Sequence, residues 1–183
     1  MSNAVQRQRV LTEAAAFQAL TMLRDVVERG TASSARALGL GDPAGGKTGT
    51  TDDFKDAWFV GFTSSVVAGV WVGFDQPASI GRNAYGAEVA LPIWVAFMRR
   101  ASRFRPAEEF VVPAGLREEE LCQVSYLRPV EGCPTYLEYF KKGDAVPARL
   151  CPLHRGSFRQ RAERTLDDVL GRIGRRLRRV FNW

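Results

Sequence analysis

The chain has 183 residues, of which 45% are hydrophobic and 25% charged, and this composition predicts a folded globular protein rather than a disordered or fibrous one. Its formal net charge is +6, with much of the excess after His154, which is compatible with an anionic partner such as a nucleic acid, a membrane surface or a cell-wall polymer. No apolar run approaches the roughly 20 residues that span a bilayer, and residues 1–10 hold no signal-peptide core, so the chain as written is expected in the cytoplasm.

The first expected element is a helix over residues 10–29. Apolar side chains recur there at helical spacing, Thr12 can cap the start, and Gly30 follows the end. Residues 31–46 are rich in small and flexible residues and are expected to form a loop.

Three short strands are expected next, over residues 46–51, 57–62 and 66–74, separated by polar turns. The short connections make them antiparallel, and the last two are apolar on both faces, which indicates a further layer on each side of the sheet. An apolar helix over residues 89–103 is expected to supply one such layer. The tryptophans of these elements are expected in the core: Trp58, Trp71 and Trp94.

The composition of the sequence changes after residue 104, which predicts that the chain has three parts. Residues 1–104 form the sheet-containing part, and residues 105–157 form an irregular extension with many prolines and three cysteines. Residues 158–183 are expected to form a basic helix with an apolar stripe. Such a helix either binds an anionic membrane surface or stays solvated and packs weakly on the rest of the domain.

Lys47 fits two different motifs. The segment from Gly41 to Thr48 matches the phosphate-binding pattern G-x-x-x-x-G-K-[ST], which would suggest a nucleotide phosphatase. That pattern requires a buried strand before it and a helix from the lysine onward. Residues 35–38 are too short and polar for such a strand, and Gly49, Thr50 and Thr51 are poor helix formers, so the phosphate-loop interpretation is set aside.

The second motif is Lys47-Thr48-Gly49, the third motif of serine penicillin-recognising enzymes. Its surroundings strengthen the match: Gly45 to Asp53, Asp56 to Phe62 and Val70 to Asp75, with Val27-x-x-Gly30-Thr31 upstream and residues 86–98 downstream. Over residues 10–155, and most densely over 45–98, the chain resembles the transpeptidase domain of class A penicillin-binding proteins. The resemblance implies an α+β fold of the serine β-lactamase and transpeptidase type, with helices on both faces of an antiparallel sheet, incomplete at its N-terminal side.

The resemblance also implies roles for four residues of the strand expected over residues 46–51. Substrate would be bound by Lys47, Thr48, Gly49 and Thr50, with the peptide lying along the sheet edge as an added strand. Lys47 and Thr50 would act in catalysis, Lys47 through its charge and proton transfer and Thr50 through a backbone N–H in the oxyanion hole.

The nucleophile of this family lies in a Ser-x-x-Lys motif, and a second motif is Ser-x-Asn. No serine of the chain is followed by lysine three positions later, and no asparagine is preceded by serine at the second motif's spacing. The chain is therefore expected to be a truncated product or a fragment of a D,D-transpeptidase of peptidoglycan synthesis, inactive by itself. The alternatives are a non-catalytic module that binds cell wall or a partner, and a serine β-lactamase-like fragment.

The resemblance implies partners and a location for the parent protein. The partners are the peptidoglycan stem peptide and β-lactams, with an anionic membrane surface possible for residues 158–183 and no nucleic acid. The parent would act at the periplasmic face of the inner membrane.

The three cysteines could form a disulfide or part of a metal site. If the parent is extracytoplasmic, a disulfide between Cys133 and Cys151 is favoured over a metal. Cys151-x-x-His154 has zinc-ligand spacing, but no fourth ligand is evident unless Cys122 supplies it, so the expectation is no metal and no cofactor.

Overall fold

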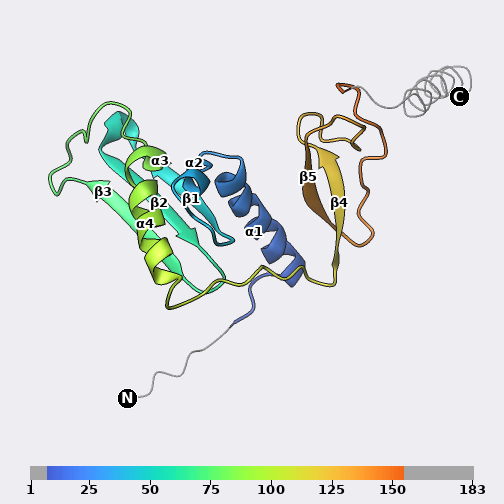
Figure 1. The fold of residues 1–183 in the computed structure, drawn as a ribbon, viewed down its shortest axis with the longest axis horizontal. Coiled ribbons are helices and arrows are strands. Elements are labelled where there is room, and N and C mark those ends of the chain that lie inside the picture. The colour runs from blue at the N-terminus through green and yellow to red at the C-terminus, as the bar shows by residue number, and fades with distance from the viewer. Residues whose placement is uncertain (1–7, 155–183) are drawn as a thin grey trace, which may run out of the picture. The chain divides into compact units, whose positions relative to one another are not determined.

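The computed structural model describes residues 8–154 and divides the chain into two compact units, with the boundary after Pro113 (Figure 1). The change in sequence composition predicts this boundary after residue 104 instead. Residues 105–113 belong to the first unit because Phe110 packs edge-on against Phe62, with the Arg24 guanidinium 5.6 Å from the centre of the Phe110 ring. The helix expected over residues 158–183 lies outside the described residues.

The first unit begins with helix α1 (Glu13–Glu28), followed by the short helix α2 (Ser34–Ala37). Thr12 caps α1 as expected: its hydroxyl accepts a hydrogen bond from the Ala15 backbone N–H at 3.2 Å. The helix expected over residues 10–29 is therefore confirmed, with its start at the cap rather than at Val10.

The sheet of the first unit contains β1 (Gly45–Thr50), β2 (Asp56–Phe62) and β3 (Val67–Gly73), antiparallel in the order β1-β2-β3. A 3-10 turn (Asp52–Phe54) joins the first two strands. This confirms the expected antiparallel arrangement. Because Lys47 lies within a strand, the structure also lacks the helix start that a phosphate-binding loop requires at this position.

Helices cover both faces of this sheet. A Cβ atom built on Gly61 would lie 2.6 Å from the ring of Trp94 in α4 (Leu91–Ala101), whereas one built on Gly45 would lie 3.2 Å from the backbone of Leu23 in α1. Gly45 pairs with Phe62, the neighbour of Gly61, and successive strand residues point to opposite faces. Helices α4 and α1 therefore pack on opposite sides, as the resemblance implied.

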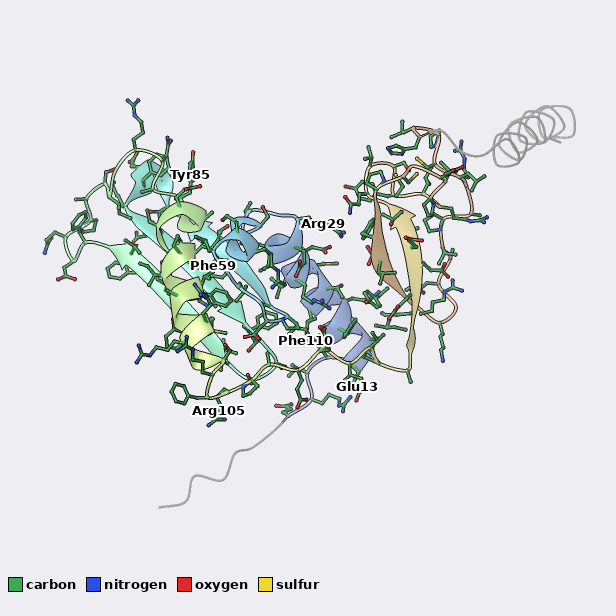
Figure 2. The ribbon with its side chains drawn as sticks, viewed as in Figure 1. Glu13, Arg29, Phe59, Tyr85, Arg105 and Phe110 are labelled. Atoms are coloured by element: carbon green, nitrogen blue, oxygen red, sulfur yellow. The ribbon has the colours of Figure 1, made fainter. Side chains whose placement is uncertain are left out.

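The core of the first unit lies between the sheet and α4. Trp94 and Phe59 are fully buried and meet edge-to-face with ring centres 4.9 Å apart. Figure 2 labels Phe59 beside α4. Trp94 is thus a core residue as expected, but Trp58 and Trp71 remain 45% and 42% exposed, and their assignment to the core is wrong for this structure. They pair across β2 and β3 on the face opposite α4, at positions that α1 leaves uncovered.

The second unit is built on a hairpin of β4 (Leu116–Cys122) and β5 (Thr135–Lys141), which pair antiparallel. The chain returns to it through an isolated bridge between Arg128 and Leu150. Cys122 and Cys151 are completely buried here, and they form the centre of a small core with Val130. Among residues 8–154, every helix is too short or too polar to cross a membrane.

Candidate functional site

Strand β1 carries the four predicted site residues, Lys47 to Thr50, at the edge of the sheet. Within the described residues, β1 has β2 as its only strand neighbour. The Thr51 N–H donates to the Asp56 carbonyl at 3.0 Å, and hydrogen-bonded pairs alternate along an antiparallel ladder. Gly49 and Lys47 therefore bond to β2, whereas the peptide groups of Thr48 and Thr50 face the open edge.

The Lys47 side chain lies along this open edge. It is exposed, and its Nζ donates a hydrogen bond to the Thr48 carbonyl oxygen at 2.7 Å, one of the groups that face away from β2. Lys47 Nζ is also 3.5 Å from the Thr48 hydroxyl. The strand thus places a positive charge beside an unpaired backbone edge, which suits a ligand that is both extended and anionic.

Two hydroxyls of β1 are oriented by residues outside the strand. Thr48 Oγ1 lies 3.2 Å from Thr31 Oγ1, and Thr50 Oγ1 accepts a hydrogen bond from the Gly86 N–H at 3.1 Å. A hydroxyl has one donor and two acceptor sites. The Thr50 hydroxyl therefore keeps its own proton to donate to a ligand while the Gly86 amide holds it in place.

Thr31 and Gly86 were not predicted as site residues. Both lie in segments that resemble the penicillin-binding family, but that resemblance assigned them no role. Gly86 opens the short helix α3 (Gly86–Val89), and a Cβ atom there would lie 2.2 Å from the Trp58 carbonyl oxygen and 2.8 Å from that of Gly49. The glycine is required because α3 approaches the strand backbone closely.

We expect Gly86→Ala to destabilise the first unit by about 1–3 kcal/mol, because the new methyl group meets backbone oxygens that cannot move aside. Gly41→Ala is the matched control, since a Cβ atom at Gly41 has no neighbour within 4 Å. Urea denaturation followed by circular dichroism measures both variants. Equal midpoints for the two would contradict the close packing of α3 against β1 and β2.

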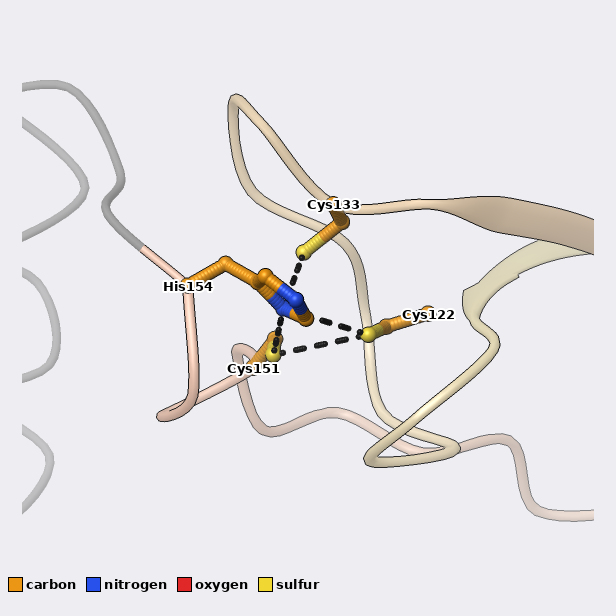
Figure 3. A group of neighbouring side chains, drawn as sticks. All are labelled: Cys122, Cys133, Cys151 and His154. Carbon is orange, nitrogen blue, oxygen red and sulfur yellow. Dashed lines mark hydrogen bonds between the residues drawn. The ribbon is translucent and has the colours of Figure 1, made fainter.

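The cysteines do not form the expected disulfide. Cys122, Cys133 and Cys151 are all free, and their sulfurs gather with the ring of His154 (Figure 3). The four ligand-type atoms lie within 4.8 Å of one another. Cys122, which sequence reasoning left uncertain as a fourth member, joins the group because β4 ends at that residue.

The surroundings of these thiols change their pKa values in opposite directions. Burial raises the pKa of Cys133 to about 11. Burial also acts to raise the pKa of Cys151, but hydrogen bonds from the side chains of Ser125 and His154 outweigh it and lower that pKa to about 6. The pKa of His154 is raised, chiefly by its hydrogen bond to Cys151.

Comparison with known proteins relates the first unit to one family. Residues 1–99 match the family described as "Penicillin binding protein transpeptidase domain". The chain is 42% identical to penicillin-binding protein 1A of Pseudomonas aeruginosa over 152 residues, which is 82% of this chain and 18% of that protein. It is 53% identical to penicillin-binding protein 1A of Neisseria lactamica over 95 residues, which is 52% of this chain and 12% of that protein.

A solved structure agrees with the sequence matches. The crystal structure of penicillin-binding protein 1A from Haemophilus influenzae superposes with a TM-score of 0.66 at 29% identity, covering 78% of this chain and 22% of that one. The chain spans 18% of the Pseudomonas protein and 22% of the Haemophilus one. It therefore covers only about a fifth of the length of these two relatives.

Proposed function

The chain belongs to the penicillin-binding protein transpeptidase family, and on that premise we propose that it supplies the substrate-binding strand of a class A D,D-transpeptidase of peptidoglycan synthesis. The single observation that carries the proposal is the open edge of β1, where Lys47 and the outward peptide groups of Thr48 and Thr50 lie together. An extended stem peptide would add to this edge as a further strand.

Each residue of the strand would have a separate task. The Thr50 N–H, which faces the open edge, would donate to the oxyanion that forms when the scissile carbonyl is attacked. The hydroxyls of Thr48 and Thr50 would donate to the terminal carboxylate of the peptide, with Lys47 adding positive charge. Gly49, without a side chain, would let the peptide backbone approach.

The chain would not perform acyl transfer by itself. That reaction requires a serine oxygen that attacks the D-Ala-D-Ala carbonyl and a base that takes the serine proton. None of the 183 residues forms a Ser-x-x-Lys motif, so the nucleophile would have to come from a preceding segment. The complete protein would then bind stem peptides and β-lactams at the periplasmic face of the inner membrane.

A fluorescent penicillin tests this proposal. We expect no covalent labelling of the 183-residue chain, because no activated serine is present to be acylated. Joining an upstream segment that carries Ser-x-x-Lys and Ser-x-Asn, taken from a relative, should produce labelling that survives denaturation. Stoichiometric labelling of the chain alone would show that one of its own serines is the nucleophile and would contradict the proposal. Reversible binding of stem peptide by both proteins, without labelling of either, would favour the alternative of a non-catalytic wall-binding module.

A further inference from the structure

The second unit contains a cluster that the transpeptidase proposal does not use. We propose that Cys122, Cys133, Cys151 and His154 bind one zinc ion, which holds this unit together. This inference is independent of the proposed function, because all four residues lie in the second unit, after the strand that would bind substrate.

Four of the six distances between the ligand atoms are close to those of a tetrahedral zinc site, and all six are within 4.8 Å. With Zn–S bonds of about 2.3 Å and Zn–N bonds of about 2.05 Å, ligand atoms around one ion are about 3.8 Å apart for two sulfurs and about 3.6 Å apart for sulfur and nitrogen. The sulfurs of Cys122 and Cys151 are 3.6 Å apart. The three sulfurs lie 3.2–3.5 Å from His154 Nδ1 (Figure 3), so these distances need to lengthen by only about 0.1–0.4 Å to admit the ion.

Four protein ligands make a closed coordination shell. A catalytic zinc site keeps a position open for water or substrate, whereas sites with three cysteines and one histidine are structural. Binding would release the thiol protons to solvent and leave three thiolates, one neutral imidazole and the ion, a site with a single net negative charge. The Val130 N–H points at the Cys133 sulfur from 3.2 Å, as a donor that stabilises a metal-bound thiolate does.

The backbone brings the ligands together from three separate segments. Cys122 ends β4, and Cys133 follows a tight turn in which its N–H donates to the Val130 carbonyl at 3.0 Å. The Cys151 N–H donates to the Arg128 carbonyl at 2.8 Å, which ties the third segment beside the first two. These bonds hold the ligands in place without any covalent link between the segments.

The second unit needs such a link for stability. A two-stranded hairpin is only marginally stable in water, and the core around Cys122 and Cys151 contains few aliphatic side chains, chiefly Val130 and Leu150. Small domains with cores of this size usually depend on a disulfide or a structural metal. Since all three cysteines are free, a metal bound by them would add the strong link between the segments that the hydrogen bonds alone do not supply.

The test uses the full 183-residue chain, purified under reducing conditions without added chelator. Native mass spectrometry and elemental analysis should find zinc equimolar with the chain. Replacement by Co²⁺ should give the visible absorption of a tetrahedral cobalt thiolate. Removing the metal with a strong chelator should abolish hydrogen-exchange protection in β4 and β5 while leaving β1 to β3 unchanged, and added zinc should restore it.

Variants separate the ligands from their neighbours. Cys151→Ser and His154→Ala should lower zinc affinity by at least tenfold, whereas Leu153→Ala, an exposed neighbour between the two, should retain the metal. His154→Cys should keep stoichiometric zinc, because a site of four cysteines is also tetrahedral. Should a ligand variant fail to fold, the cobalt spectrum of the unaltered chain decides alone.

Two results would overturn the proposal. One is a chain whose three thiols all react freely, that lacks zinc, and that shows no tetrahedral spectrum when Co²⁺ is titrated in. The other is a Cys133–Cys151 disulfide found intact by peptide mapping in the protein isolated from its native compartment. Neither result bears on penicillin labelling, so the two proposals fail separately.

Discussion

Replacing Trp94 by alanine should unfold the first unit or leave it barely stable. Trp94 is completely buried, packs edge-to-face on Phe59, and donates from Nε1 to the Ala68 carbonyl oxygen at 3.0 Å. Truncation of a buried tryptophan costs about 3–5 kcal/mol, and the orphaned carbonyl adds about 1–3 kcal/mol. Whole domains are stable by only about 5–15 kcal/mol, so most of the stability should be lost.

The neighbouring Ile93 is the matched control for this prediction. It lies on the same helix but is 53% exposed, so Ile93→Ala should cost less than about 1 kcal/mol. Both changes introduce alanine at adjacent helical positions, so gains in helix propensity are similar. Urea denaturation followed by far-ultraviolet circular dichroism compares them. Similar midpoints for the two variants would mean that α4 does not close the core as described.

Thr50→Pro should lower the rate of penicillin acylation by about 100- to 1,000-fold in the chain extended with the upstream serine motifs. Proline lacks the N–H that would stabilise the oxyanion. Because the Thr50 N–H faces the open edge rather than β2, the substitution removes no hydrogen bond of the β1–β2 ladder. The loss should therefore appear in acylation and much less in pairing of the strands.

Thr50→Val distinguishes the backbone donor from the side chain. Valine keeps the N–H and the branched shape but removes the hydroxyl that Gly86 holds, so acylation should slow by about tenfold, the value of one hydrogen bond. Acylation rates are measured with a fluorescent penicillin, and circular dichroism checks that each variant is folded. Equal rates for the two variants would contradict the role of the Thr50 amide.

The helix of residues 13–28, the three antiparallel strands and the helix of residues 91–101 could all be predicted from local patterns. Caps, turns and periodic apolar residues depend on neighbours in sequence. The cap at Thr12 and the turn at Asp52–Phe54 could therefore be predicted from the sequence directly. The family was also readable, because Lys47-Thr48-Gly49 and its flanks lie in one continuous segment.

Exposure of the tryptophans could not be read in the same way. Trp58, Trp71 and Trp94 all lie in strongly apolar segments, yet only Trp94 is buried. Which face of a doubly apolar strand is covered depends on the helices that pack there, and these are distant in sequence.

The sequence by itself therefore determined the type of fold, the strand that carries Lys47 and Thr50, and the family. Only the tertiary structure showed that the three free cysteines gather around the ring of His154. Their spacing along the chain favoured a Cys133–Cys151 disulfide and left only a partial metal site, because the four-residue cluster depends on three segments brought together by the Arg128–Leu150 bridge and the end of β4. Distances between atoms so far apart in sequence arise from folding, and no local pattern encodes them.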